Sequence, residues 1–373
     1  MEIKKKYIIG ISVCVLLIVS VFFIFNQGKS NEQVVTEYFE LLKKKDYKQM
    51  YQMLNQKTVY TPTQKYFVEK YKEIYDDIGA NNIQVKMLDE KNDIVKTMTS
   101  SGTTGQQVSR IFLDRETSSA QQKCLTKIVS HFLGTKRVPM LILDSSAVVK
   151  NRNMFSARGA GILGFSIFGN KRQYALNENM ELDIEGMKEF LENNKDETIF
   201  MFGFTFMIWQ HFYKKLLESG YKPDLSKGVL IHGGGWKKLV TEKITPEEYK
   251  KNLNEVCGIL PDNVHDYYGM VEQTGCIYME CECGHLHASA FSDVLIRRPF
   301  DFSLAEIGEK GLIEVVSVLP ESYPGHVLLT EDEGRILGED DCPCGLKGKY
   351  FKIEGRIKNA ELRGCSDTYA TKF

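Results

Sequence analysis

The chain has 373 residues, of which 43% are hydrophobic, and this length allows two domains or one large domain with an appendage. Its formal net charge of −1 excludes a global basic field of the kind that favours nucleic-acid binding. Six of the nine cysteines lie between Cys276 and Cys365, and this clustering indicates metal or thiol chemistry in a reducing compartment rather than a disulfide framework.

The N-terminal segment, residues 1–29, is predicted to be a membrane anchor. Lys4, Lys5 and Lys6 precede an uncharged run over residues 7–25, and about 20 apolar residues span the hydrocarbon core of a bilayer. No small-residue cleavage signal follows, which favours an anchor over a cleaved signal peptide, with a buried core helix as the alternative. The lysines would stay inside the cell and the rest of the chain would be exported.

Residues 30–90 have the pattern of a short helical segment. A capping-box sequence begins at Ser30, Asp46 is suited to cap a second short helix, and Pro62 and Gly79 bracket a third. Apolar residues recur on one face of each helix, which we interpret as core packing.

From about residue 92, apolar runs alternate with helical stretches. The predicted strands are VPMLIL (138–143), TIFMFGF (198–204) and GVLI (228–231). Helices are predicted over Thr117–Phe132, which Gly134 ends, and over Phe206–Leu217, whose Trp209 and Phe212 we assign to core packing. Strands separated by helices predict an α/β sheet over residues 91–373, with a domain boundary near residues 88–95.

A small polar loop lies at the start of this domain, in TMTSSGTTGQQVSR (97–110). No Gly-Lys-Ser or Gly-Lys-Thr follows and QVSRIFLD has a strand pattern, so this is not a Walker loop. Backbone N–H groups and hydroxyls in such a turn can still face one anion, which makes it a candidate phosphate cradle, with a plain polar turn as the alternative. The candidate residues are Ser100, Ser101, Gly102, Thr103, Thr104 and Gly105.

Further motifs follow in the order HGGGWK (232–237), YGMVEQTG (268–275), LLTEDEGRI (328–336) and GRIKNAEL (355–362). In this order they resemble the adenylate-forming enzymes. An acid carboxylate that attacks the α-phosphate of ATP needs its negative charge screened, which Mg²⁺ and preorganised donors provide. The resemblance implies an ATP site made of the Ser/Thr/Gly loop, of Gly233, Gly234 and Gly235 beside adenine, of Tyr268, of Glu272 as the Mg²⁺ ligand, and of Asp332 and Arg356 at the ribose.

Within this superfamily the chain most resembles the acyl-protein synthetases of the LuxE type. The motifs, which run from about Thr97 to Tyr369, are SARGAGILGFSIFG, LIHGGGWKKL, HLHASAFSDVLIRRP, SYPGHVLLTEDEG, DCPCGLKGKYF and AELRGCSDTY. The resemblance implies ATP-dependent activation of a long-chain fatty acid, transfer of the acyl group to Cys365, and delivery to a reductase-type protein partner. A thiolate is a strong nucleophile, and nearby Arg363 would favour its ionised form.

The phosphate loop departs from the superfamily pattern. Gln106 and Gln107 stand where the loop usually ends in Pro-Lys, so the phosphate charge must be met by other residues. Arg297 and Arg298 form a further pair that either meets phosphate or lies in a solvated turn. The candidate replacements for the missing lysine are Arg110, Lys237 and Arg356.

The segment before the phosphate loop also departs from the family pattern. Residues 31–87 resemble the opening of the NTF2-like, MecA-type domain that follows the anchor in some penicillin-binding proteins. A single-pass anchor with the lysines inside would export the catalytic domain, whereas ATP chemistry belongs in the cytoplasm. The side of the membrane on which the domain lies therefore stays open.

Two clusters of sulfur and nitrogen donors, CECGHLH (281–287) and CPCG (342–345), follow the nucleotide motifs. Tetrahedral Zn²⁺ commonly takes four such ligands from two sequence-distant clusters. A similar arrangement in phenylacetate-CoA ligase-like enzymes suggests Cys281, His287, Cys342 and Cys344 as the ligands, and Cys283 or His285 could replace one of them. Free thiols in a reducing cell are the alternative.

The sequence therefore predicts a transmembrane helix, a short helical segment, and an adenylate-forming α/β domain without a full C-terminal lid. The expected cofactors are ATP, Mg²⁺ and Zn²⁺, and the expected partners are a fatty acid, an acyl-accepting protein and the membrane, but not nucleic acid. Two alternatives stay open. The first is an acyl-CoA ligase that releases its product to coenzyme A. The second is a non-catalytic, membrane-anchored module of the penicillin-binding type with a vestigial ligase domain.

Overall fold

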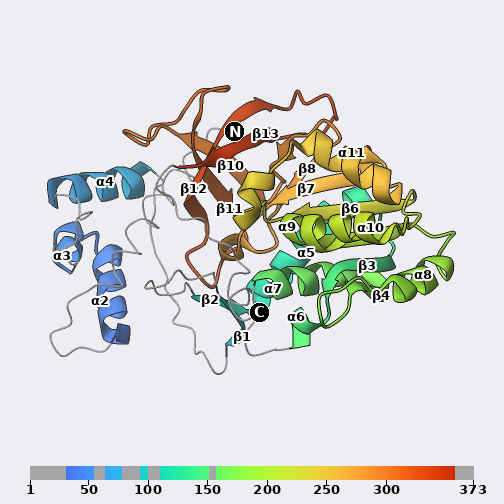
Figure 1. Cartoon of the computed structure of the whole chain (residues 1–373). Helices are drawn as coiled ribbons and strands as arrows, with labels where there is room; N and C mark the ends of the chain where they lie inside the picture. Colours follow the sequence, from blue (N-terminus) through green and yellow to red (C-terminus); the bar gives the residue numbers. More distant parts are fainter. Residues whose placement is uncertain (1–30, 54–63, 78–92, 100–109, 151–156, 358–373) are drawn as a thin grey trace.

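The computed structural model describes residues 31–53, 64–77, 93–99, 110–150 and 157–357. Asp46 caps the second helix, as predicted, by accepting a hydrogen bond from Gln49 N. The first three helices of the described residues share a small core in which the hydroxyl oxygens of Tyr38 and Tyr71 lie 2.8 Å apart. These helices, which form a group at one side of the molecule (Figure 1), are α2 (Asn31–Lys43), α3 (Tyr47–Gln52) and α4 (Gln64–Asp77).

A two-stranded hairpin follows, formed by β1 (Ile94–Thr99) and β2 (Arg110–Asp114), in which Thr99 pairs with Arg110. The strand predicted from QVSRIFLD is thus present as β2. The predicted phosphate loop, residues 100–105, lies between the two strands in the sequence and outside the described residues. Asp114 then caps α5 (Arg115–Leu133), and Gly134 ends this helix as predicted, with φ at +75°.

One mixed sheet forms the centre of the main domain and has eleven strands within the described residues. The parallel half comprises β7, β6, β5, β3 and β4, whereas the remaining neighbours pair antiparallel. The predicted α/β class is confirmed. In sheet order the strands are β10 (Ser292–Arg297), β11 (Gly311–Ser317), β12 (Val327–Glu339), β13 (Lys349–Arg356), β9 (Leu286–His287), β8 (Tyr278–Glu280), β7 (Val264–Tyr268), β6 (Gly228–Gly233), β5 (Ile199–Phe204), β3 (Val138–Ser145) and β4 (Gly169–Leu176).

Alternating side chains of β5 show that both faces of the parallel half are buried. Ile199 and Met201 belong to one core, while Phe200 and Phe202 belong to a second core on the opposite face. Helices therefore cover this half of the sheet on both sides (Figure 1), as parallel sheets require. The first core includes side chains from α8 (Ile184–Glu192), α10 (Lys214–Ser219) and α11 (Pro246–Cys257), and the second from α5 and α7 (Ala157–Phe165).

The helix predicted over Phe206–Leu217 is divided into three segments. After α9 (Thr205–Met207), residues Ile208–Tyr213 form a π-helical turn that leads into α10. A π turn adds one residue to the helical repeat, and here Trp209, Phe212 and Leu216 all reach the same core. The interpretation of Trp209 and Phe212 as core residues is confirmed by their burial.

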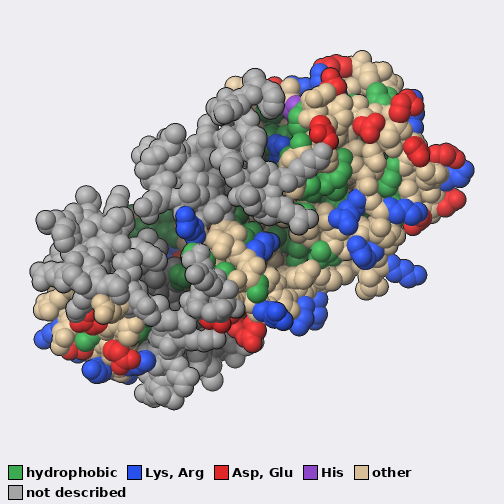
Figure 2. All heavy atoms as spheres, turned by 90° about the horizontal axis from the view of Figure 1, so that it is seen from below, with side chains coloured by type: hydrophobic (Ala, Val, Ile, Leu, Met, Phe, Trp, Pro, Cys, Tyr) green, Lys and Arg blue, Asp and Glu red, His purple; other side chains and the backbone are tan. Residues whose placement is uncertain are grey.

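The membrane anchor predicted over residues 1–29 lies outside the described residues. Among the residues that are described, no helix is both long enough and apolar enough to cross a bilayer. Acidic and basic side chains both appear on the face of the molecule shown in Figure 2, in keeping with the formal net charge of −1.

Candidate active site

The carboxyl ends of the parallel strands bring several predicted site residues to one edge of the sheet. β6 ends at Gly233 and β7 ends at Tyr268, and these two strands are parallel neighbours. Glu272 follows in the 3₁₀ turn Val271–Gln273, directly after β7. Ligands of open α/β sheets bind at this edge because loops from neighbouring strands meet there.

The glycine turn after β6 has a backbone that only glycine adopts without strain. Gly234 and Gly235 have φ values of +81° and +64°, in the left-handed region. A Cβ on Gly234 would lie 2.6 Å from the Phe204 ring, and a Cβ on Gly233 would lie 2.8 Å from the Tyr267 carbonyl oxygen. Gly234 and Gly235 are exposed, so their backbone is open to close approach by a flat ligand.

Thr205, which the sequence analysis did not single out, fixes this turn from the start of α9, directly after β5. Its Oγ1 lies 3.0 Å from His232 Nδ1 and donates to the Gly233 carbonyl at 3.1 Å. Burial lowers the pKa of His232 to about 3, and the nearby charge of Lys250 acts in the same direction. The imidazole is therefore neutral and serves as a hydrogen-bonded support beneath the turn. A single threonine directly after an apolar strand gives no sequence signal for this role.

Tyr268, Asp332 and Arg356 come together although they lie on three strands. The Tyr268 hydroxyl donates to Asp332 Oδ2 at 2.8 Å, and Arg356 Nε lies 3.2 Å from Asp332 Oδ1. Asp332 and Arg356 are direct partners in the β12–β13 ladder. Burial, followed by the charge of Asp332, raises the pKa of Tyr268 well above its usual value, which keeps its hydroxyl protonated as a donor.

Gln273 anchors the turn that carries Glu272. Its side chain is 2% exposed, and its Nε2 donates to the Gly325 carbonyl at 2.8 Å and to the Val315 carbonyl at 3.2 Å. A Cβ on Gly325 would lie 2.6 Å from the Glu272 carbonyl oxygen, so the two segments are in close contact. The position of Glu272 is thus set by its neighbour in sequence and by a loop of the antiparallel half.

The Cys/His cluster is assembled from the two predicted donor motifs. The ligand atoms of Cys281, His287, Cys342 and Cys344 all lie within 4.8 Å of one another. Cys344 Sγ is 3.5 Å from His287 Nε2, and Cys281 Sγ is 4.0 Å from Cys342 Sγ. Zn–S bonds of about 2.3 Å place sulfur ligands of one tetrahedral ion roughly 3.8 Å apart. The donor types and their separations therefore fit a zinc ion.

The two alternative ligands differ in their positions. Cys283 is exposed, whereas His285 Nδ1 lies 3.4 Å from Cys342 Sγ with its ring stacked on Tyr350. Burial lowers the pKa of His287, and a neutral imidazole is the form that binds metals. The geometry favours His287 as the fourth donor and places His285 beside the cluster.

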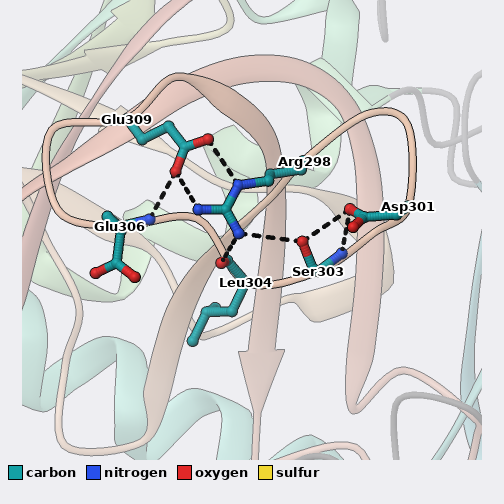
Figure 3. A network of polar contacts seen from close by, with 6 residues as sticks. All are labelled: Arg298, Asp301, Ser303, Leu304, Glu306 and Glu309. Atoms are coloured by element: carbon teal, nitrogen blue, oxygen red, sulfur yellow. Dashed lines mark hydrogen bonds and ion pairs between the residues drawn. The ribbon is translucent and has the colours of Figure 1, made fainter.

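Arg297 and Arg298 both bind carboxylates around the β10–β11 connection. Arg297 binds both carboxylate oxygens of Glu314, at 2.8 and 2.9 Å. Arg298 binds both oxygens of Glu309, and its Nη1 also donates to Ser303 and to the Leu304 carbonyl (Figure 3). These bonds use most of the guanidinium donors to order the loop.

Some predicted site residues lie outside the described part of the chain. These are the phosphate-loop residues Ser100 to Gly105 and the predicted acyl acceptor Cys365. Arg110, a candidate phosphate contact, is exposed at the start of β2, next to the loop. Arg356, the third candidate, bonds Asp332 and also Glu331, whose carboxylate lies 3.2 Å from its Nη2.

Comparison with known families identifies the chain. The family model described as "Acyl-protein synthetase, LuxE" matches residues 31–373. The chain belongs to the LuxE acyl-protein synthetase family. The match begins at residue 31 and so includes α2 to α4, while the NTF2-like resemblance of this segment stays a prediction. No curated protein sequence matches the chain.

Solved structures show the fold that this LuxE family member shares. An open conformation of 2-hydroxyisobutyryl-CoA ligase, in complex with 2-HIB-AMP and CoA, is 14% identical and has a TM-score of 0.52. The match covers 72% of this chain and 58% of that chain. At this identity the likeness shows the α/β fold of adenylate-forming ligases and nothing about the substrate.

Two further structures are similar at lower TM-scores. A long-chain-fatty-acid-CoA ligase (FadD1) from Archaeoglobus fulgidus is 15% identical, with 77% of this chain and 56% of that chain covered and a TM-score of 0.48. ATP-bound MatB from Rhodopseudomonas palustris is 16% identical, with 76% and 52% covered and a TM-score of 0.46. The chain thus spans about half the length of the ligases that it matches.

Proposed function

We propose that the protein activates a carboxylic acid with ATP and transfers the resulting acyl group to its own Cys365. Family membership supports this proposal. The observation that carries it is the meeting of Tyr268, Asp332 and Arg356 at the sheet edge where the exposed Gly234–Gly235 backbone lies. A carboxylate that accepts from a tyrosine and an arginine is fixed in place and keeps lone pairs for ribose hydroxyls.

The proposed reaction has two steps. An oxygen of the acid carboxylate attacks the α-phosphorus of ATP, and pyrophosphate leaves as the acyl adenylate forms. The Cys365 thiolate then attacks the acyl carbonyl, and AMP leaves as the thioester forms. Glu272 would hold Mg²⁺, which screens the phosphate charges when it is bound. The Gly233 turn and the Asp332 pair orient the nucleotide, because both are fixed by bonds to neighbouring strands.

We propose a long-chain fatty acid as the substrate, with subsequent delivery of the acyl group to a reductase-type protein. Membership of the LuxE family supports this substrate class.

We also propose that Cys281, His287, Cys342 and Cys344 hold one Zn²⁺ as a structural clip. All four are placed by strands β8, β9, β12 and β13 or by their connections. A site closed by four protein ligands leaves no open coordination position for catalysis. The clip would therefore stabilise the antiparallel half of the sheet and take no part in acyl transfer.

The first test is acid-dependent exchange of pyrophosphate into ATP by the purified protein with Mg²⁺. Exchange should appear with long-chain fatty acids, and Glu272→Gln should reduce it by weakening the Mg²⁺ site. No exchange with a broad panel of fatty and aromatic acids would contradict the activation step and favour the vestigial module.

The second test follows the acyl group itself. Labelled myristate and ATP should give a hydroxylamine-sensitive label on the protein, and Cys365→Ser should lose this label while it keeps exchange. Cys283→Ser, which removes an exposed thiol near the metal cluster, is the matched control and should keep both. A label that persists in Cys365→Ser, or equal acyl transfer to coenzyme A by that variant, would replace the proposal with an acyl-CoA ligase.

A further inference from the structure

Arg158 forms a buried ion pair at the same edge of the sheet. Its Nε lies 3.0 Å from Asp144 Oδ2, and the two side chains are 15% and 0% exposed. Asp144 is the last residue but one of β3, and its Oδ1 accepts from Ser145 N at 2.6 Å. Removing an ion pair from water costs free energy that a pair of apolar residues would not incur. The pair therefore calls for a reason beyond packing.

Most donors of this guanidinium have no partner among the described residues. An arginine has five N–H groups. Besides Asp144, the described contact of Arg158 is with Met207 Sδ, at 3.5 Å from Nη1, and a thioether is a weak acceptor. Burial raises the pKa of Asp144 to about 6, against the opposing effect of the Arg158 charge, so the carboxylate is ionised at neutral pH. Asp144 thus forms an ion pair with the Nε side of the guanidinium, and the described residues offer the Nη side no strong acceptor.

The start of α7 places Arg158 where the parts of the site converge. Two residues further on, Ala160 packs against the core of the β1–β2 hairpin, which includes Met98, and Val271 beside Glu272 packs against the same core. A Cβ on Gly161 would lie 3.0 Å from the Phe204 ring, the same ring that contacts the Gly234 turn. Helix α7 therefore lies beside two parts of the proposed site. One is the β1–β2 hairpin, next to the phosphate loop, and the other is the glycine turn after β6.

The proposed reaction needs a cation at this place. Its two reactants, a carboxylate and a triphosphate, are both anions and repel each other as they approach. The phosphate loop has Gln106 and Gln107 where related loops have Pro-Lys, so its usual lysine is absent. The described bonds of Arg356 go to Asp332 and Glu331, which places that guanidinium at the ribose position.

We propose that Arg158 binds an anionic oxygen of the reactants, with Asp144 fixing the orientation of its guanidinium. This inference rests on the proposed acid activation, and it assigns to Arg158 the positive charge that the phosphate loop lacks. The shared chemistry is a bidentate guanidinium–oxyanion contact, and the oxyanion belongs either to the acid carboxylate or to an ATP phosphate. Arg158 would then lower the charge repulsion between the two reactants.

The test uses the full chain and the variants Arg158→Gln and Arg158→Lys. Exchange is measured with myristate and ATP varied separately, and ATP binding is measured by calorimetry without the acid. Losing a charge-assisted hydrogen bond should raise one KM about 10- to 100-fold. A rise in the KM of myristate alone assigns the carboxylate, whereas a rise in the KM and Kd of ATP assigns a phosphate. Arg158→Lys should recover only part of the loss, because an ammonium is not bidentate.

The control is Arg137→Gln. Arg137 precedes the opposite, amino end of β3 and donates to the Gly169 carbonyl, so its loss should leave both KM values unchanged. If Arg158→Gln does not fold because Asp144 is left unpaired, the double variant Asp144→Asn/Arg158→Gln replaces it and is checked by its thermal midpoint. A folded variant with both KM values and the ATP Kd within twofold of wild type would overturn the proposal. If the wild type shows no exchange, the proposed function fails, and the Kd values of ATP and of myristate, each measured by calorimetry on wild type and Arg158→Gln, decide the role of Arg158.

Discussion

Removal of the proposed zinc ion should lower the free energy of unfolding. The size of the loss depends on how far apart the ligands lie in the sequence. Cys281 and Cys342, whose sulfur atoms lie 4.0 Å apart, are separated by 61 residues in the chain. Linking two positions this far apart removes loop entropy from the unfolded chain that corresponds to about 4 kcal/mol. We therefore expect chelation, or Cys342→Ser, to lower the free energy of unfolding by about this amount.

The assay combines metal analysis with urea unfolding. Protein purified without a histidine tag should contain about one equivalent of zinc, which a chelator should remove. With a urea dependence of about 3 kcal/mol per molar, the loss moves the unfolding midpoint down by roughly 1.3 M. Circular dichroism is a suitable probe because it reports the strands and the helices together.

The control for this experiment is Cys283→Ser, since Cys283 is exposed and lies outside the four-residue cluster. It should bind zinc and unfold as the wild type does. Two results would refute the reasoning: protein that is free of metal yet as stable as the preparation with zinc, or equal destabilisation by Cys283→Ser and Cys342→Ser. The first result would mean that the four side chains stabilise the fold as free thiols and imidazole without a metal. The second would mean that the destabilisation does not depend on whether the cysteine belongs to the cluster.

Three further predictions concern single side chains. Thr205→Val, which removes the hydroxyl bonded to His232 Nδ1 and to Gly233 O, should raise the KM of ATP about tenfold with little change in kcat, whereas Thr205→Ser should behave as wild type in exchange assays. Tyr268→Phe should weaken ATP binding about fivefold in calorimetry, because the Tyr268 hydroxyl bond to Asp332 is lost. Burial lowers the pKa of His265 from 6.5 to about 4. Protons therefore bind the unfolded chain preferentially, and stability is lost as the pH falls from 6.5 towards 4. At pH 5 this loss of stability is about 2 kcal/mol. Urea unfolding of His265→Gln, compared at pH 7.5 and pH 5, should not show this loss. A variant with the pH dependence of the wild type would contradict the role given to His265.

Features that depend on neighbouring residues could be predicted from the sequence. The strands at 138–145, 199–204 and 228–233 follow from apolar runs, and the end of α5 follows from Gly134. The meeting of Tyr268 with Asp332, across 64 residues, was implied by the order of family motifs rather than by any local pattern. Motif order carries such information because related chains place equivalent segments on equivalent strands.

Features that depend on tertiary packing could not be predicted. Asp144 and Arg158 belong to different elements, and nothing in VPMLILDS or SARGAG indicates that the two side chains pair. The role of Thr205 depends on the parallel register that sets Phe204 beside Gly233. The π turn after β5 could not be predicted either, because the core residues Trp209, Phe212 and Leu216 keep the ordinary spacing of an α-helix.

The ladder between β12 and β13 connects the proposed zinc clip with the proposed nucleotide site. At one end Glu339 pairs with Lys349, beside Cys342 and Cys344, and at the other end Asp332 pairs with Arg356. β13 has eight residues, so at about 3.3 Å per residue the clip acts roughly 25 Å from the ribose contacts. An ion at that distance cannot take part in the chemistry, but it can hold in register the two strands that present Asp332 and Arg356. Loss of the ion should therefore raise the KM of ATP and lower stability, while kcat at saturating ATP changes little. A fall in kcat with an unchanged KM would place the metal in the reaction itself.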